Sequence, residues 1–294
     1  MQRKYTKPQI ARFVIIVCAL IFLYLPIMIL IVYSFNESKM VTVWTGFSLK
    51  WYVALFNNAP IIDAVITSFI IAFMTSISCV IIGTLAAFVL VRVKKFTGES
   101  AFMVFMTAPM ILPEVITGLA LLLMFVTLGD FIPVFADRGI IAIWVAHVTF
   151  CSAYTTVVIR SRMRELDISI EEAAMDLGAG PIKVFFYIIL PAIMPAEVAA
   201  LLLSFTMSMD DLVITSFIAG PDSTTLPMLI FSSVRRGMSP QINALSTIIV
   251  LIVSVFTFFA WLSMVRSQKR KAQDAAKAAK AAKIERQRAI HHHH

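Results

Sequence analysis

The stretch SIEEAAMDLGAGPIKVFFYIILP, residues 169–191, lies between two long apolar runs. It carries four charged side chains, which are costly to place in hydrocarbon, so we expect an ordered loop at the membrane surface. Ser169 and Glu172 have the spacing of a capping box, and Gly178 supplies a left-handed stop. Between these signals, apolar residues recur at helical spacing: Ile170, Ala173, Ala174 and Leu177. The stretch therefore predicts a short helix with a small apolar face that a protein groove can bind.

The same stretch resembles the EAA loop of permease subunits in bacterial ABC importers. The family pattern is EAA, three residues, G, nine residues and I-x-L-P, and this chain matches it with Glu172, Ala173, Ala174, Gly178, Ile188, Leu190 and Pro191. In that family the helix fits a cleft on a cytoplasmic ATPase and passes on its closing motion. The resemblance implies that Glu172, Ala173, Ala174 and Gly178 couple the chain to an ATPase. The alternative is an ordinary interfacial loop rich in alanine.

The composition is that of a membrane protein. The chain has 294 residues, of which 60% are hydrophobic and 14% are charged, and its mean hydropathy is +0.88. These values lie far outside the range of soluble globular proteins. The formal net charge of +8 would suit a nucleic acid partner, but the placement of the charges fits membrane topology instead, so no nucleic acid partner is expected.

Six apolar stretches are long enough to cross a bilayer, which takes about 20 helical residues. We expect these spans at about 13–35, 64–91, 101–128, 140–159, 192–219 and 242–265. Of the 25 lysines and arginines, only five fall in the predicted outer loops: Lys39, Lys50, Arg138, Arg235 and Arg236. By the positive-inside rule, both termini and the 169–191 loop are cytoplasmic.

The predicted fold class is therefore an all-α integral membrane protein with six transmembrane helices. We expect a transmembrane permease domain over residues 1–265 and a basic cytoplasmic tail over 266–290. His291–His294 has the form of an expression-tag remnant. Pro109 and Pro113 interrupt the third span, so its helix should be kinked.

The carboxylates within the predicted spans include Glu114, Asp210 and Asp211. A charged side chain there costs about 2.5 to 3.5 kcal/mol on insertion scales. Because no lysine or arginine lies near them in the spans, their neutralising partner is a proton, another subunit or a cationic substrate. Amine cations pair with carboxylates and with aromatic faces. Together with Trp144, the three carboxylates are our predicted substrate path, for which Phe150 and Phe217 are further candidate aromatic residues.

Each of these polar residues also has a structural interpretation. Glu114 can be a neutral acid that donates to a carbonyl freed by Pro113. Adjacent helical residues point about 100° apart, so one of Asp210 and Asp211 can face the path while the other caps a broken helix. The sequence does not choose between the two aspartates. His147 in the fourth span is more often a satisfied interior histidine than a site.

Four further stretches extend the resemblance: TAPMILPEVITGLALLLMF (107–125), AHVTFCSAYTTVVI (146–159), LSFTMSMDDLVITSFIAGP (203–221) and SPQINALSTI (239–248). With the EAA-like loop, they are similar to the second permease subunit of putrescine/spermidine ABC importers. The resemblance implies the type I ABC importer permease fold in a bacterial inner membrane. It also implies a heterodimer with a homologous permease, two ATPase subunits, a periplasmic polyamine-binding protein and a polyamine substrate.

The chain contains no G-x-x-x-x-G-K-[ST] phosphate loop, so energy must come from a partner or a gradient. Our main hypothesis is a non-catalytic transport subunit with no catalytic residue, metal or cofactor of its own. A gradient-driven secondary amine transporter, with the intramembrane carboxylates as a proton relay, is the alternative. A third possibility, a structural membrane protein, leaves those carboxylates unexplained.

Overall fold

The computed structural model describes residues 7–40, 43–93, 96–237, 239–255, 257–259, 262 and 265–266. All named elements in this part of the chain are helical, and one isolated β-bridge joins Asn36 to Phe47. Five of the described helices are long and apolar enough to cross a membrane, and one sharply bent pair can supply a sixth crossing. The all-α membrane fold is confirmed. The basic tail from residue 267 onward, with the terminal histidines, lies outside the described residues.

The chain divides into two compact units, and the first comprises residues 1–55 and 238–294. Its described part contains α1 (Lys7–Ser34), most of α2 (Lys50–Phe56) and a helix over Pro240–Phe259. The most apolar part of α1 has no buried residue. A long helix with an uncovered apolar surface is stable in hydrocarbon, so α1 suits the predicted first span.

The loop that follows α1 is organised by the buried residue Asn36. Its amide group donates to the Val43 carbonyl at 2.7 Å, and its side-chain oxygen accepts from the Thr45 N–H at 3.0 Å. The Trp51 indole donates to the Asn36 carbonyl at 2.7 Å. The polar groups of Asn36 are thus satisfied, and they fix the loop between α1 and α2.

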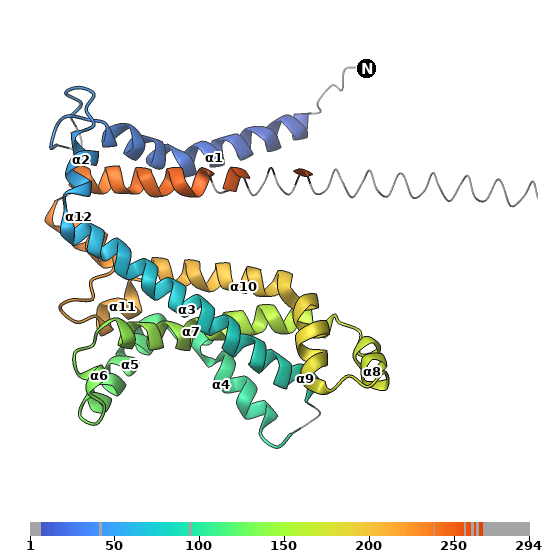
Figure 1. Ribbon diagram of the computed structural model, residues 1–294. Coiled ribbons are helices and arrows are strands. Elements are labelled where there is room, and N and C mark those ends of the chain that lie inside the picture. The colour runs from blue at the N-terminus through green and yellow to red at the C-terminus, as the bar shows by residue number, and fades with distance from the viewer. Residues whose placement is uncertain are drawn as a thin grey trace, which may run out of the picture. The chain divides into compact units, whose positions relative to one another are not determined.

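The second unit, residues 56–237, is organised around three long helices. These are α3 (Ala59–Arg92), α7 (Ile140–Arg164) and α10 (Leu190–Asp210), which pack side by side (Figure 1). Close packing of α3 against α7 depends on Gly83, because a Cβ there would come within 2.9 Å of Thr155 Oγ1. The glycine therefore permits an approach that a larger residue would oppose.

The predicted third span is divided into α4 (Glu99–Ile111) and α5 (Glu114–Gly129), which are bent by 113° at the break. The break falls at Pro113, which has no N–H to continue the first helix. The interruption expected from Pro113 is present as a complete break between two helices, whereas Pro109 lies inside α4. The bend lets α5 pack against the short helix α11 (Val213–Ile218).

The predicted fifth span is also divided. α10 ends at Asp210, Asp211 is extended with φ −66° and ψ 122°, and α11 begins two residues later. The predicted fifth span, 192–219, therefore contains two helices, and the break between them falls at the aspartate pair, where the sequence allowed one aspartate to cap a broken helix. An apolar cluster that includes Phe125, Ile143 and Ile214 holds α5, α7 and α11 together. Two short helices of the second unit lie in the predicted outer loops: α6 (Pro133–Ala136) and α12 (Leu226–Arg236).

The inner end of the second unit contains the helix that the sequence predicted within 169–191. α8 (Ile168–Asp176) is followed by α9 (Pro181–Val184) and by a π-helical turn, Phe185–Ile189, that leads into α10. Within this unit, α8 projects beyond the three long helices at the end opposite α6 and α11 (Figure 1). A second apolar cluster, which includes Ala87, Ile159 and Val184, packs α9 and the start of α10 against α3 and α7.

Candidate functional site

The projecting helix α8 begins at an aspartate cap. Asp167 Oδ1 accepts a hydrogen bond from the Ser169 N–H at 3.0 Å, and the helix begins at Ile168. Hydrogen bonds from the main chain and the side chain of Ser169 lower the pKa of Asp167. The predicted capping box of Ser169 with Glu172 is therefore wrong, because an aspartate two residues upstream supplies the cap.

The end of α8 follows the prediction. Gly178 has a φ of 88°, and its N–H donates to the Met175 carbonyl at 2.9 Å. The next N–H, of Ala179, donates to the Ala174 carbonyl at 3.0 Å. This left-handed stop, which favours glycine, satisfies carbonyls at the end of the helix and turns the chain toward α9.

The two sides of α8 differ in what they contact. Glu172, Ala173 and Gly178 are exposed, whereas Ala174 is half-buried against the apolar cluster under α9. The exposed side also carries larger apolar residues: Ile168, Ile170, Met175 and Leu177. Of the four predicted coupling residues, three are therefore available to a partner, and Ala174 instead attaches the helix to its own chain.

The inward side of α8 carries a buried ion pair that sequence reasoning missed. Glu171 Oε1 lies 2.6 Å from Arg92 Nη2, and the two side chains are only 10% and 9% exposed. Arg92 Nε also donates to the same oxygen at 2.8 Å. From the sequence, Arg92 was used only as a basic residue that orients the membrane spans. The adjacent glutamates Glu171 and Glu172 were the available signal, since only one of them can face outward on a helix.

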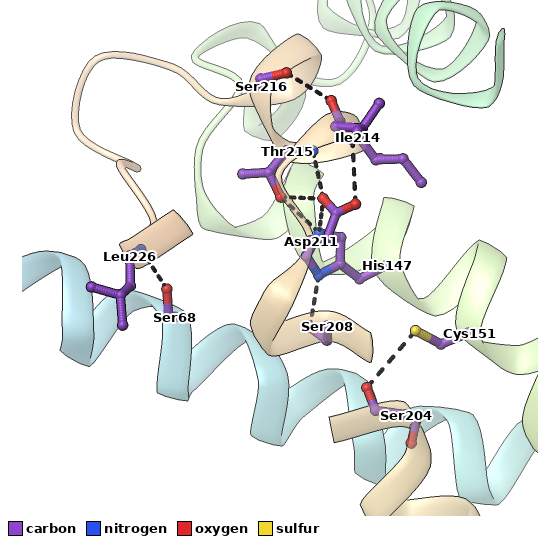
Figure 2. A network of polar contacts seen from close by, with 11 residues as sticks. Ser68, His147, Cys151, Ser204, Ser208, Asp211, Ile214, Thr215, Ser216 and Leu226 are labelled. Carbon is purple, nitrogen blue, oxygen red and sulfur yellow. Dashed lines mark hydrogen bonds and ion pairs between the residues drawn. The ribbon is translucent and has the colours of Figure 1, made fainter. Parts of the chain in front are cut away.

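A second polar site lies where α7 meets the break between α10 and α11. There His147 Nδ1 lies 2.7 Å from Ser208 Oγ, and Nε2 lies 2.9 Å from Thr215 Oγ1. Nε2 also lies 3.3 Å from Asp211 Oδ2 (Figure 2). Both ring nitrogens have partners, so His147 is a satisfied interior histidine that joins α7 to α10 and α11.

The same network separates the two adjacent aspartates. Asp211 is buried and accepts from the Thr215 N–H at 2.8 Å and from the Thr215 hydroxyl at 2.6 Å. It also accepts from the Ile214 N–H at 3.4 Å, so its carboxylate caps α11. Asp210 is exposed. The sequence left open which aspartate faces the path; the geometry commits Asp211 to internal bonds and leaves Asp210 available.

The remaining predicted path residues, Trp144 and Glu114, lie on different helices. The Trp144 indole donates to Ser78 Oγ at 3.3 Å and lines a groove of about 350 Å³ between α3 and α7. Glu114 is exposed at the start of α5. Among the described residues, no hydrogen bond or ion pair joins Glu114, Asp210 and Trp144 to one another.

A further carboxylate within the membrane, Glu197 of α10, was missed by sequence reasoning. It is half-buried and accepts a hydrogen bond from the Thr84 hydroxyl of α3 at 3.1 Å. Its place inside the predicted fifth span was a sufficient signal, because carboxylates are costly there. The hydroxyl of Thr84 provides it with a partner between the two helices.

Comparison with known proteins shows which family this architecture belongs to. Residues 79–273, more than half of the chain, match the family described as "Binding-protein-dependent transport system inner membrane component". The chain belongs to this family. It is therefore a multi-pass membrane protein of an ABC transport system, and α8 lies between its fourth and fifth long apolar segments, within the matched residues.

Individual relatives agree with this assignment. The putrescine transport system permease protein PotI of Escherichia coli (strain K12) is 56% identical over 239 residues, which cover 81% of this chain and 85% of the relative. The spermidine/putrescine transport system permease protein PotC of Haemophilus influenzae (strain ATCC 51907 / DSM 11121 / KW20 / Rd) is 41% identical over 230 residues, which cover 78% of this chain and 87% of the relative.

A solved structure supports the fold. It is a bacterial ABC transporter involved in the import of the acidic polysaccharide alginate, and it aligns with a TM-score of 0.68 over 89% of this chain and 99% of that chain. At 14% identity, this likeness bears on the fold alone. The predicted type I ABC importer permease fold is confirmed.

Proposed function

We propose that this chain is one of two permease subunits of an ATP-driven polyamine importer in a bacterial inner membrane. The 56% identity to a putrescine permease over most of its length supports the substrate class. The observation that carries the mechanism is α8, a capped helix that offers Glu172, Ala173 and an apolar surface at the cytoplasmic end. We assign hydrolysis of ATP to a partner, because the chain has no phosphate-loop motif.

The proposed complex contains a second, homologous permease, two ATPase subunits and a periplasmic polyamine-binding protein. ATP binding closes the ATPase pair, and the exposed side of α8 moves with the ATPase cleft that holds it. The permease pair then opens outward, and the binding protein releases polyamine into it. Hydrolysis resets the inward-open state, from which the substrate leaves.

Along the path, the exposed carboxylates are the groups that meet a cationic substrate. Asp210 and Glu114 each offer a negative charge to an ammonium group, and Trp144 offers an aromatic face to a cation. Asp211 does not contact the substrate in this proposal. It caps α11 and so stabilises the break between α10 and α11 that leaves Asp210 exposed. Two carboxylates on different helices suit a diamine, which carries one charge at each end.

The gradient-driven alternative has less support. Broken helices with carboxylates near the breaks are compatible with it. Membership of a binding-protein-dependent transport family, however, favours a system in which a separate protein delivers the substrate. The exposed side of α8 has no role in a transporter driven by a gradient alone.

Uptake into proteoliposomes tests the proposal. The chain is reconstituted with its copurified partners, with the binding protein outside and ATP inside, and labelled putrescine is followed over time. We expect accumulation that requires both ATP and the binding protein. Accumulation driven by a proton gradient without ATP would contradict the proposed energy source, and ATP-dependent uptake that excludes polyamines would contradict the substrate class.

A further inference from the structure

The attachment of α8 to the rest of the chain is unusually polar. Of its nine residues, Glu171 is buried and Ala174 is half-buried, and the others are exposed. A single alanine methyl group offers little apolar area, so the hydrophobic effect contributes little to holding the helix in place. Glu171 must therefore supply much of the attachment.

The carboxylate of Glu171 is held by a guanidinium from another helix. Arg92 approaches Glu171 Oε1 with Nη2 at 2.6 Å and with Nε at 2.8 Å. Arg92 Nη2 also donates to the Leu166 carbonyl, in the segment that leads into α8, at 3.4 Å. One side chain thus holds both α8 and its approach. Charge-assisted bonds of this kind are strong and directional, and they are screened little when both groups are buried.

Arg92 is the last residue of α3, and α3 is part of the three-helix core. It packs along both α7 and α10. A force on α8 that passes through Arg92 therefore acts on the inner end of a long helix whose residues also line the Trp144 groove. A force on α8 can also pass along the main chain, into α7 on one side and α9 on the other.

We propose that the buried ion pair between Arg92 and Glu171 is a transmission link, through which displacement of α8 moves the inner end of α3. The inference rests on the proposed function, because it assumes that a partner ATPase displaces α8. Adjacent glutamates then have separate tasks: Glu172 faces the partner, and Glu171 holds the helix to its own permease. Both Arg92 and Glu171 are positioning residues, since neither needs to touch the substrate.

Charge reversal and charge exchange test the link. Arg92→Glu, Glu171→Arg and the double exchange are reconstituted as the full complex, and putrescine uptake is measured together with ATP hydrolysis. We expect each single reversal to lower the uptake per ATP hydrolysed by about tenfold, and the exchange to restore it to within about threefold of the original. A residue needed only for assembly would lower uptake and hydrolysis together and leave their ratio unchanged.

The chain offers a matched control at the same end of the unit. Arg162 Nη1 lies 2.7 Å from Glu165 Oε2, but these side chains are 44% and 62% exposed. Exposed pairs contribute little, so Arg162→Glu and Glu165→Arg should leave the ratio within about twofold. If reversal at Arg92 or Glu171 prevents assembly, Glu171→Gln removes the charge with little change of shape and is used instead.

Two kinds of outcome distinguish a transmission link from a purely structural contact. A ratio within twofold of the original in the Arg92 and Glu171 variants, or an exchange that restores nothing, overturns the link. Hydrogen exchange at residues 168–176, measured on the chain in detergent, gives a readout that needs no substrate. If hydrogen exchange at these residues is faster in the single variants and returns to the original rate in the double variant, the ion pair holds α8 in place. This conclusion stands even if the original complex imports no polyamine, because that result would overturn only the proposed substrate.

Discussion

Two buried pairs of polar side chains lie at the two ends of the same helical unit, and their surroundings differ. At the inner end, Arg92 and Glu171 approach to 2.6 Å, and the pair joins a projecting helix that has little other contact with the chain. At the outer end, His147 and Asp211 lie 3.3 Å apart inside a network closed by Ser208 and Thr215. The outer pair also lies beside a large apolar cluster.

The comparison shows that a buried polar pair can either fix a local shape or pass motion from one helix to another. When each polar atom of a buried pair has a partner and the surroundings are apolar, the pair fixes a local shape, here the break between α10 and α11. When the pair is almost the only contact of a helix, it can pass motion between elements. Breaking the outer pair should therefore reduce stability, and changes around α8 should reduce coupling.

The largest expected effect on stability is at the outer pair. Asp211→Ala removes the cap of α11 and leaves the buried N–H groups of Ile214 and Thr215 without their acceptor, so we expect the free energy of unfolding to fall by about 3 kcal/mol. The midpoint of thermal unfolding in detergent measures this. Asp210→Ala is the matched control and should leave the midpoint unchanged, because Asp210 is exposed. Equal midpoints in both variants would remove the distinction between the two aspartates.

At the inner end, the largest expected effect on transport follows from Gly178→Val. A β-branched residue is strained at a φ of 88°, so the stop of α8 should be displaced and coupled uptake should fall by about tenfold. Gly180 is the matched control. Its φ is −69°, and an added Cβ would have no atom within 4 Å, so Gly180→Val should retain most uptake. Equal losses in the two variants would show that the glycine conformation at 178 is not what matters.

An intermediate effect is expected at the exposed aspartate. Asp210→Asn keeps the size of the side chain and removes its charge, so putrescine uptake should fall by about fivefold while thermal unfolding stays the same. Uptake is measured at low substrate concentration, where weaker attraction of the cation is most visible. Uptake at the original rate would exclude Asp210 from the path.

The smallest effect concerns the cap of α8. Because hydrogen bonds from Ser169 lower the pKa of Asp167 in the folded protein, this cap contributes stability above the pKa of the unfolded chain, about 3.9, and loses it as the pH falls through the folded-state pKa. Hydrogen exchange at 168–176 should therefore show constant protection from pH 7 to about pH 5 and decreasing protection below that. Asp167→Asn, which also caps helices, should remove this part of the pH dependence. An unchanged pH profile in the variant would assign the titration to another group.

Local signals in the sequence predicted some of this architecture and not the rest. The short helix in 169–191 and its glycine stop follow from residues within one turn of each other, and they are confirmed. The cap was misplaced because Asp167 and Ser169 are both good N-cap residues, and the sequence offered no way to rank them. The angle of the break between α4 and α5 could not be predicted for a different reason. Pro113 marks where α4 ends, but the 113° bend places α5 against α11, where Gly118 lies next to Phe217 and Ile214, and these contacts are distant in sequence.

The candidate sites show the same limit. The sequence identified both aspartates of the outer pair but could not orient them, because Asp211 is turned inward by His147, a residue on a different helix. The inner pair joins residues 79 positions apart, and no local pattern connects them. Contacts of that kind depend on how α3 and α8 come together in three dimensions, which spacing alone does not reveal.

The contact between Arg92 and Glu171 also limits how the EAA-type segment can be exchanged between related permeases. A chimera that receives residues 168–176 from a relative keeps a working attachment only if the donor segment has a carboxylate at the position of Glu171, or if position 92 is exchanged with it. An insertion of one residue before α8 would turn the helix by about 100° and bring Ile170 in place of Glu171 toward Arg92. Residues 168–176 therefore cannot be exchanged independently of the residue at position 92 on α3.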